Sequence, residues 1–325
     1  MSACVEIKHL YKTYFRRKWL FGKGEKFPVL KDVSLSVPAG GVLGLVGESG
    51  CGKTTLCKVL LGIEKPTSGV VLADGKNTAE LSKAEWKDVR RVMQVVYQDP
   101  YASLDPRMSI RQILSEPLDI HGLQKNRAGR DAFLKNLLSS VGLSETFLER
   151  YPHEFSGGQR QRICIARALA LNPKILVADE PVSALDVSVQ AQILNLLKKI
   201  RRERQIAMLF VTHDFAVARF LCDEIAVMYK GRIVERAAAA ELFANPLHPY
   251  TRALLAAVPR VGGAPFDVSQ TASVCAERAD WACPFAPRCA QSCAACETKA
   301  FELTEIYPRH WCACGVTSAG KQENL

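Results

Sequence analysis

The sequence predicts an α/β fold in which helices connect the short strands of a largely parallel sheet. The observations behind this class are apolar runs at 42–46, 175–178, 206–212 and 225–229. Each run has the length and continuous apolar character of a strand that is buried on both faces. The first two runs lead directly into residues that carry chemistry, the first into a glycine-rich loop and the second into a pair of acids.

The elements around these strands follow in chain order. Residues 3–47 are expected to form strands on either side of a basic stretch at 16–23. A turn then leads to a short strand at 70–72, and an apolar strand at 92–97 runs up to Gln98.

Helical periodicity dominates residues 100–172, and a further helix is expected over 245–258 after a proline-rich turn. The glycine and proline residues at 261–265 are typical of a linker. We therefore expect two parts, an α/β domain over 1–260 and a small cysteine-rich region over 261–325.

The glycine-rich loop matches the pattern G-x-x-x-x-G-K-[ST], which binds nucleotide phosphates between a strand and a helix. Its glycines allow successive backbone N–H groups to point at an anion, and the N-terminus of the following helix adds positive potential. Lys53 is expected to reach the β- and γ-phosphates, and the Thr54 hydroxyl to ligate Mg²⁺. The residues of this phosphate loop are Gly47, Glu48, Ser49, Gly50, Cys51, Gly52, Lys53, Thr54 and Thr55.

The acids at the end of the run 175–178 are Asp179 and Glu180. In a doubly wound sheet they face the cleft at the carboxyl ends of the strands, beside the phosphate loop. Asp179 is expected to hold Mg²⁺ through water, and Glu180 to orient or deprotonate the attacking water.

Upstream of these acids, Ser156 begins a helical pattern with two glycines in its first turn. A serine in this place is typical of a helix N-cap, and the glycines allow a phosphate to approach the backbone.

Together these motifs resemble the ATP-binding subunits of ABC transporters over about residues 5–260. Three further segments resemble the oligopeptide/dipeptide importer group, and within it the second of the two ATPase subunits. The six family motifs are the phosphate loop, Gln98, Ser156–Gln159, Val177–Glu180, Ser183–Asp186 and Val211–Asp214; the group segments are Gln98–Arg107, Tyr151–Phe155 and Asn245–Leu254.

The resemblance implies further roles at the nucleotide. Gln98 would sense the γ-phosphate and Mg²⁺, and His213 would hold the hydrolytic geometry together with Glu180. Tyr14 is the best match to the aromatic residue that stacks on adenine, with Tyr11 as a close alternative.

The resemblance also implies an assembly. Ser156 and Gly158 would cap the γ-phosphate of ATP held by a second ATPase subunit, and Asp186 would link the two sites. The expected partners are that second subunit, in a heterodimer, together with two transmembrane permease subunits and, through them, a substrate-binding protein.

Composition fits a peripheral subunit. The chain has 325 residues and a net charge of +10, but its basic residues are scattered, which argues against nucleic acid as a partner. No apolar run approaches the roughly 18 residues that span a bilayer, and the first residues lack a signal-peptide pattern. We expect the protein on the cytoplasmic face of the inner membrane.

Cysteines gather near the end of the chain, and a cytosolic thiol cluster points to metal rather than to disulfides. The importer group often carries a C-x5-C-x6-C pattern followed by His-x3-Cys. Cys283, Cys289, Cys296 and Cys314 fit this spacing, with His310 before the last. Four thiolates suit a 4Fe–4S cluster or Zn²⁺, and reduced free thiols are a third alternative. The further cysteines in this region, Cys275, Cys293 and Cys312, have no assigned role.

The expected function is ATP hydrolysis that powers the import of di- or oligopeptides. Two alternatives stay open. One is the ATPase of a related nickel or glutathione importer, and the other is a metal- or redox-sensing ABC ATPase that does not act in transport.

Overall fold

The computed structural model describes residues 3–16, 25–124, 126–257, 283–298 and 302–315. Most of the basic stretch at 16–23, the expected linker at 261–265 and Cys275 lie outside these residues.

A central sheet of eight strands organises the molecule, in the order β11-β12-β10-β9-β3-β8-β7-β6. The five strands from β9 to β6 are parallel, and β10, β12 and β11 extend the sheet in antiparallel pairs. Every residue of β3, β7 and β8 is buried, as the continuous apolar runs predict. The strands are β3 (Val42–Val46), β6 (Met93–Val96), β7 (Ile175–Asp179), β8 (Ala207–Thr212), β9 (Glu224–Tyr229), β10 (Arg232–Ala238), β11 (Thr304–Tyr307) and β12 (His310–Cys312).

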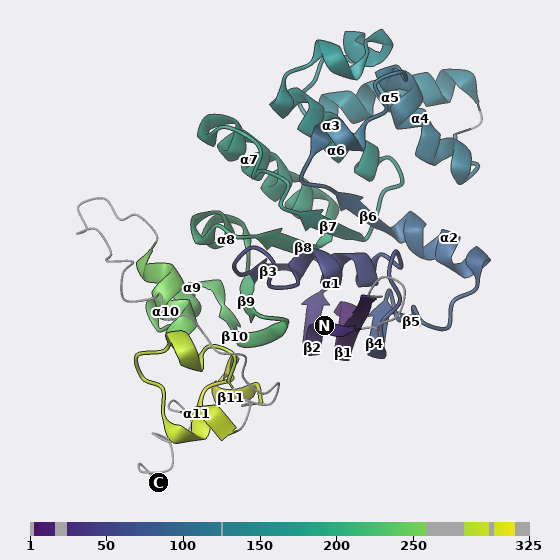
Figure 1. Cartoon of the computed structure of the whole chain (residues 1–325). Helices are drawn as coiled ribbons and strands as arrows, with labels where there is room; N and C mark the ends of the chain where they lie inside the picture. The colour runs from purple at the N-terminus through teal and green to yellow at the C-terminus, as the bar shows by residue number, and fades with distance from the viewer. Residues whose placement is uncertain (1–2, 17–24, 125, 258–282, 299–301, 316–325) are drawn as a thin grey trace.

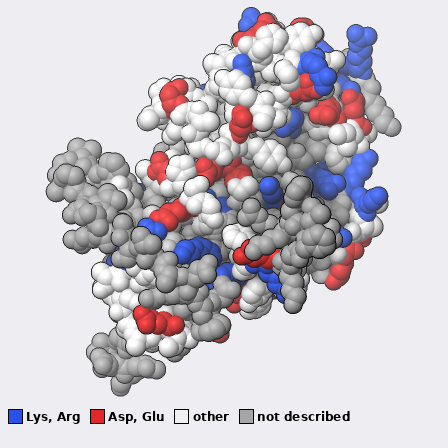
Figure 2. Space-filling model, in the orientation of Figure 1, with Lys and Arg blue, Asp and Glu red and all other residues white. Residues whose placement is uncertain are grey.

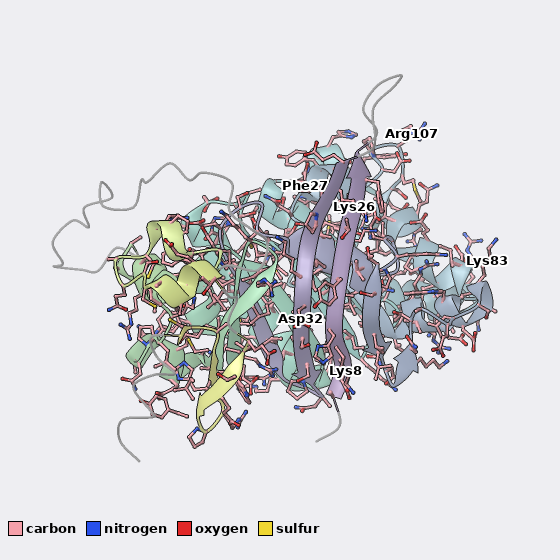
Figure 3. The ribbon with its side chains drawn as sticks, turned by 60° about the horizontal axis from the view of Figure 1, so that its bottom comes forward. Lys8, Lys26, Phe27, Asp32, Lys83 and Arg107 are labelled. Atoms are coloured by element: carbon pink, nitrogen blue, oxygen red, sulfur yellow. The ribbon has the colours of Figure 1, made fainter. Side chains whose placement is uncertain are left out.

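A second, antiparallel sheet has the order β2-β1-β4-β5. Helix α1 (Lys53–Leu60) lies between the two sheets (Figure 1), and one hydrophobic core joins Ile7 of β1, Leu56 of α1 and Leu45 of β3. The long strands β1 and β2 run side by side in Figure 3, with Phe27 near one end and Asp32 farther along β2. The strands are β1 (Ala3–Arg16), β2 (Glu25–Pro38), β4 (Ser68–Ala73) and β5 (Lys76–Asn77).

A helical subdomain follows β6 and stands at one end of the molecule, away from the C-terminal segment (Figure 1). Its helices begin at polar caps, as at Ser109, whose side chain and that of Gln112 each bond the other's backbone N–H. The helices are α3 (Pro100–Ser103), α4 (Ile110–Ile120), α5 (Arg127–Ser140) and α6 (Gly157–Leu169), with short 3₁₀ turns at Glu145–Glu149 and Pro152–Glu154. The helical character predicted for 100–172 is confirmed.

The remaining helices border the central sheet, and α10 is shorter than the helix expected at 245–258 because its N-cap is His248. They are α2 (Lys83–Val92), α7 (Val187–Arg204), α8 (Phe215–Leu221), α9 (Ala239–Ala244), α10 (Pro249–Ala256) and α11 (Ala294–Thr298). Among the described residues, no helix combines the length and the apolar character needed to cross a bilayer. On the face shown in Figure 2, basic and acidic side chains are interspersed.

The C-terminal segment is part of the central sheet. Its hairpin β11–β12 pairs with β10, so that Trp311 lies opposite Arg236. A 3₁₀ turn (Ala286–Arg288) and α11 precede this hairpin (Figure 1), and Phe285, directly before the turn, packs against Tyr250 of α10. The sequence did not reveal this pairing.

Candidate nucleotide-binding site

The phosphate loop connects β3 to α1, in the strand-loop-helix setting that the motif requires. Gly50 and Gly52 have φ of 79° and 115°, a left-handed backbone that other residues rarely adopt. A Cβ at Gly47 would lie 2.2 Å from the Met228 carbonyl oxygen, so only glycine fits there. No described side chain caps the N-terminus of α1, which leaves its backbone N–H groups directed at the loop.

Lys53 lies at the centre of this loop with its side chain buried. Its ammonium donates hydrogen bonds to the carbonyl oxygens of Gly47 (2.7 Å) and Glu48 (3.0 Å). It also lies 3.8 Å from a carboxylate oxygen of Glu180. The lysine thus brings a positive charge between the loop and the acids that follow β7.

Asp179 ends β7 and is 7% exposed. Burial raises the pKa of its carboxyl. A hydrogen bond from the Thr54 hydroxyl opposes this rise, and the charge of the nearby Glu180 adds to it. Its Oδ1 atom is buried and has no hydrogen-bond partner among the described residues. An orphaned carboxylate oxygen beside a threonine hydroxyl fits a divalent cation, because both are hard oxygen ligands.

Glu180 and His213 meet at the ends of adjacent strands, with His213 Nδ1 3.1 Å from Glu180 Oε2. The backbone of Glu180 is left-handed, with φ of 49°, and its N–H donates to the Val211 carbonyl at 3.0 Å. A left-handed glutamate is strained, and the bond to the neighbouring strand holds it in place. The pair that the sequence predicts at the hydrolytic position is therefore brought together.

Gln98 follows β6 and is exposed. The segment around it is tied to α6: Gln161 donates to the Tyr97 carbonyl at 3.4 Å, and Arg160 lies over the Tyr101 ring. Gln161 is fully buried, and its Oε1 has no partner among the described residues. Sequence reasoning missed Gln161, although a glutamine on an otherwise apolar helix face is the signal that could have found it.

Ser156 caps α6, as predicted, and forms a capping box with Gln159. Gly158 lies against helix α7, where a Cβ would come within 2.4 Å of Val189. Asp186 caps α7 by accepting a hydrogen bond from the Val189 N–H at 3.0 Å, and this bond lowers the pKa of its carboxyl. Ser156 and Asp186 therefore have structural roles within this chain, besides those that the resemblance implies.

Tyr14 is half-buried on β1, opposite Phe27 of β2, with the Lys12 ammonium 4.7 Å from its ring centre. Tyr11 is 40% exposed, and Phe27 is 64% exposed. Both Tyr14 and Phe27 thus offer aromatic surface on the same strand pair.

The thiols of the C-terminal segment approach one another. Cys293 Sγ lies 3.5 Å from Cys296 Sγ, and the Cys283 N–H donates to the Cys296 carbonyl at 2.9 Å. Burial raises the pKa of Cys283 and Cys289, and the charge of a Cys314 thiolate would raise both further. Within the described residues, however, no three His, Cys, Asp or Glu side chains form a group that could hold a metal ion.

His310, which precedes Cys314 in the sequence, pairs its side chain with a carboxylate. It is fully buried, and its Nε2 lies 2.8 Å from the equally buried carboxylate of Glu235. His310 therefore helps to anchor the hairpin β11–β12 to β10.

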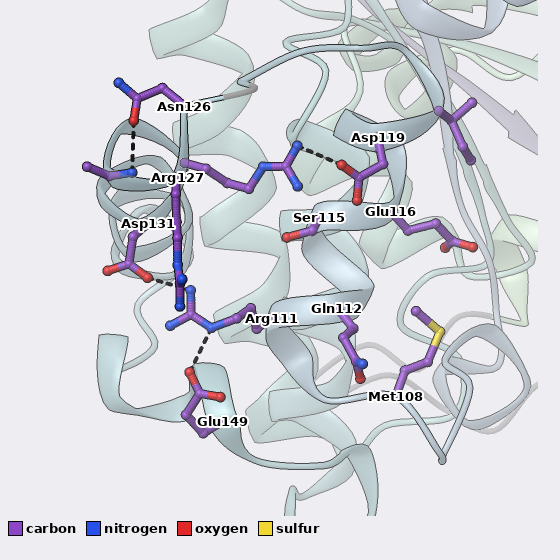
Figure 4. A pocket seen from close by; sticks show the side chains of 13 residues that line it. Met108, Arg111, Gln112, Ser115, Glu116, Asp119, Asn126, Arg127, Asp131 and Glu149 are labelled. Atoms are coloured by element: carbon purple, nitrogen blue, oxygen red, sulfur yellow. Dashed lines mark hydrogen bonds and ion pairs between the residues drawn. The ribbon is translucent and has the colours of Figure 1, made fainter.

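A pocket of about 1280 Å³ lies between α4 and α5. Figure 4 shows Arg111 paired with Glu149 and Asp131 in its lining. Arg130 of the same lining pairs with Asp119. The pocket contains none of the predicted site residues.

The phosphate loop lies between two sheets, and the helical subdomain that follows contains helix α6, which starts with Ser-Gly-Gly. Together these features define the ATP-binding cassette class of ATPases. Comparisons with known proteins agree. The model of the ABC transporter family matches residues 30–183, and that of the oligopeptide/dipeptide transporter C-terminal region matches residues 234–296. The chain belongs to the ABC transporter family.

Two relatives from Bacillus subtilis are similar over most of their length. The oligopeptide transport ATP-binding protein OppF is 47% identical over 78% of this chain and 82% of its own length. The oligopeptide transport ATP-binding protein AppF is 42% identical over 98% of both chains.

Solved structures share the fold. CbiO1 from Clostridium perfringens, part of the ABC transporter complex cbiONQ, has a TM-score of 0.64 and 28% identity, covering 75% of this chain and 92% of its own. The cassette MJ0796, in a dimeric post-hydrolysis state with ADP and Pi, has a TM-score of 0.63 and 32% identity, covering 72% and 98%.

Proposed function

We propose that this chain hydrolyses ATP to power the import of di- or oligopeptides through an ABC transporter. The observation that carries the proposal is the match of residues 234–296 to the oligopeptide/dipeptide transporter C-terminal region, next to a complete ATP-binding cassette. The names of OppF and AppF support the same substrate class.

In the proposed reaction the loop N–H groups and Lys53 bind the β- and γ-phosphates of ATP. Thr54, Asp179 and Gln98 would hold Mg²⁺, which neutralises charge on those phosphates when bound. Glu180 orients the attacking water and accepts its proton, and His213 holds that carboxylate through the 3.1 Å contact. Burial of Lys53 strengthens its attraction for the phosphates, and burial of Asp179 would strengthen the attraction of its carboxylate for Mg²⁺.

The proposed assembly is a head-to-tail pair of ATPase subunits. Ser156 and Gly158 of one subunit cap the γ-phosphate of ATP on the other, and Asp186 links the two sites. We propose that this chain is the second ATPase subunit of a heterodimer. Movement around Gln98 would pass to two permease subunits at the cytoplasmic face of the inner membrane, and these receive peptide from a substrate-binding protein.

For the C-terminal segment we propose that Cys283, Cys289, Cys296 and Cys314 hold a 4Fe–4S cluster, with Zn²⁺ as the alternative. Four thiolates are a suitable donor set for either, and the effect of a Cys314 thiolate on the pKa of Cys283 and Cys289 supports the proximity of these three residues. As the side chains lie, they do not form a metal-holding group among the described residues. The proposal therefore requires the thiols to draw together.

The transport proposal is tested in proteoliposomes that contain the complete transporter and its binding protein. Di- or oligopeptides should stimulate ATP hydrolysis, and the Glu180→Gln variant should abolish the stimulated rate. Stimulation by a nickel chelate or glutathione, and not by peptides, would establish the related importer instead.

The metal proposal is tested by iron and zinc analysis and a visible spectrum of protein purified without oxygen. A brown thiolate-to-iron band that is lost in Cys296→Ser would support the cluster, and one zinc per chain the alternative. The absence of both iron and zinc from the protein would overturn the proposal. An ATPase rate that depends on the metal without any permease partner would favour the redox-sensing alternative.

A further inference from the structure

The phosphate loop is held from outside by two residues that come later in the chain. Arg288 donates two hydrogen bonds to the Glu48 carboxylate, each of 3.0 Å. The Glu48 N–H donates to the Tyr250 hydroxyl, also at 3.0 Å. Glu48 is thus fixed both through its side chain and through its backbone.

An aromatic cluster holds these two partners in place. The Tyr250 ring packs 4.5 Å from Tyr229 and 5.4 Å from Phe285, and both Tyr250 and Phe285 are buried. The Arg288 guanidinium lies 5.6 Å from the Phe285 ring centre and 5.9 Å from that of Tyr229. A guanidinium held over two rings loses little freedom when it forms a bidentate pair.

The backbone of Arg288 is fixed by the cysteine-rich segment. Its N–H donates to the Phe285 carbonyl at 2.9 Å, within a turn that begins at the Cys283 carbonyl and ends at Cys289. Arg288 therefore belongs to the C-terminal segment, and Glu48 belongs to the phosphate loop, 240 residues away in the sequence.

The contact between Arg288 and Glu48 fixes a part of the loop that is proposed to bind phosphate. Lys53 donates to the carbonyl oxygens of Gly47 and Glu48, so a shift of Glu48 also moves the lysine and the loop N–H groups. We propose that Arg288 is a positioning residue of the nucleotide site, which sets the affinity for ATP by clamping Glu48. This inference rests on the proposed role of the phosphate loop.

The test compares Arg288→Ala, Glu48→Gln and the double variant in the full chain. Binding of a fluorescent ATP analogue and the KM for ATP are measured together. Each single variant should weaken nucleotide binding about fivefold, because a partly exposed bidentate pair is lost, with a much smaller change in kcat. The double variant should bind nucleotide no more weakly than the single variant with the lower affinity, since both substitutions remove the same contact. Arg288→Lys, which keeps the charge and loses the fork, should fall between wild type and Arg288→Ala.

The matched control is Arg309→Ala. Arg309 ties the same C-terminal segment to Glu224 at the start of β9, and Glu224 does not belong to the phosphate loop. Its removal should leave nucleotide affinity unchanged. Equal losses in Arg309→Ala and Arg288→Ala would overturn the proposal in favour of general loosening, and so would unchanged affinity in Arg288→Ala or additive losses in the double variant.

Failure of this proposal is distinguishable from failure of the loop assignment. Lys53→Ala should abolish nucleotide binding whatever Arg288 does. If Lys53→Ala binds ATP normally, the loop assignment is wrong. If it does not bind, while Arg288→Ala and Arg288→Lys bind like wild type, only the clamp is wrong.

Discussion

The nucleotide site and the C-terminal segment are held together by different interactions. Around the phosphate loop, the fully buried strands β3, β7 and β8 form parallel ladders inside large hydrophobic cores. The C-terminal hairpin adds a small hydrophobic cluster, which contains Leu247, Ile306, Cys312 and Cys314. Its attachment depends more on a few buried polar groups.

Glu235 is the centre of that attachment. It is fully buried on β10 and accepts hydrogen bonds from the N–H groups of Leu247 (2.7 Å) and His248 (2.9 Å). His310 of β12 completes the set at 2.8 Å. We therefore expect substitutions at the nucleotide site to remove chemistry and leave the fold, and substitutions of Glu235 to lower the stability of the fold and leave the chemistry.

The largest expected effect is on chemistry. Glu180→Gln removes the group that accepts the proton of the attacking water, so turnover should fall at least about 100-fold. Because the amide is isosteric, ATP should stay bound and the melting temperature should change little. ATPase assays, nucleotide binding and thermal denaturation on the same preparation check this.

Lys53→Ala is the companion variant, which should lose binding itself. A Glu180→Gln protein that turns over at a near-normal rate would refute the role of Glu180. One that unfolds would break the comparison, since the site would then contribute to stability as the C-terminal segment does.

The second effect is on stability. Glu235→Gln leaves two backbone N–H groups and His310 with a poorer acceptor in a fully buried place, which should cost about 3 kcal/mol of unfolding free energy. Denaturant titration measures it. The control Glu305→Gln changes an exposed acceptor on β11 and should cost far less. Equal stability of the two variants would mean that Glu235 does not anchor the hairpin.

The sites of Glu180→Gln and Glu235→Gln differ in how far the sequence could predict them. The positions of Lys53, Asp179 and Glu180 follow from short spacings next to apolar strands, because strand order brings the carboxyl ends together. The contacts of Glu235 with His310 and of Glu48 with Arg288 join residues 75 and 240 positions apart. No local pattern encodes such pairs, since they depend on how the C-terminal segment docks.

A third effect depends on pH. Burial lowers the pKa of His248 to about 4, with a further lowering by Arg252 and an opposing effect of Glu235. The folded pKa thus lies below the unfolded value of about 6.5, so the unfolded chain binds more protons as pH falls. Stability should be present above pH 6.5 and decrease toward pH 4, by about 2 kcal/mol between pH 7 and pH 5.

Denaturant titrations at pH 7 and pH 5 measure that decrease. His248→Asn keeps a side-chain acceptor for the Tyr250 N–H and removes the titrating group. Its absolute stability should be lower, but the difference between the two pH values should shrink. An unchanged difference would show that other groups cause the acid sensitivity.

The smallest effect compares two nearly identical helix caps. Ser156 and Ser109 each accept a hydrogen bond from the backbone of a glutamine three residues later, at 3.3 and 3.4 Å. Each backbone also donates to that glutamine's side chain. Replacing either serine by alanine should therefore cost about 1 kcal/mol of stability.

Turnover should separate the two caps in the assembled transporter. Only Ser156 is proposed to reach the nucleotide of the partner subunit, so only Ser156→Ala should lower the ATPase rate beyond what its stability loss explains. Equal rates in the two variants would leave Ser156 as a cap alone. In that case the sequence motif at α6 would report on helix initiation, and the capping of the partner's γ-phosphate would have to come from other groups of this chain.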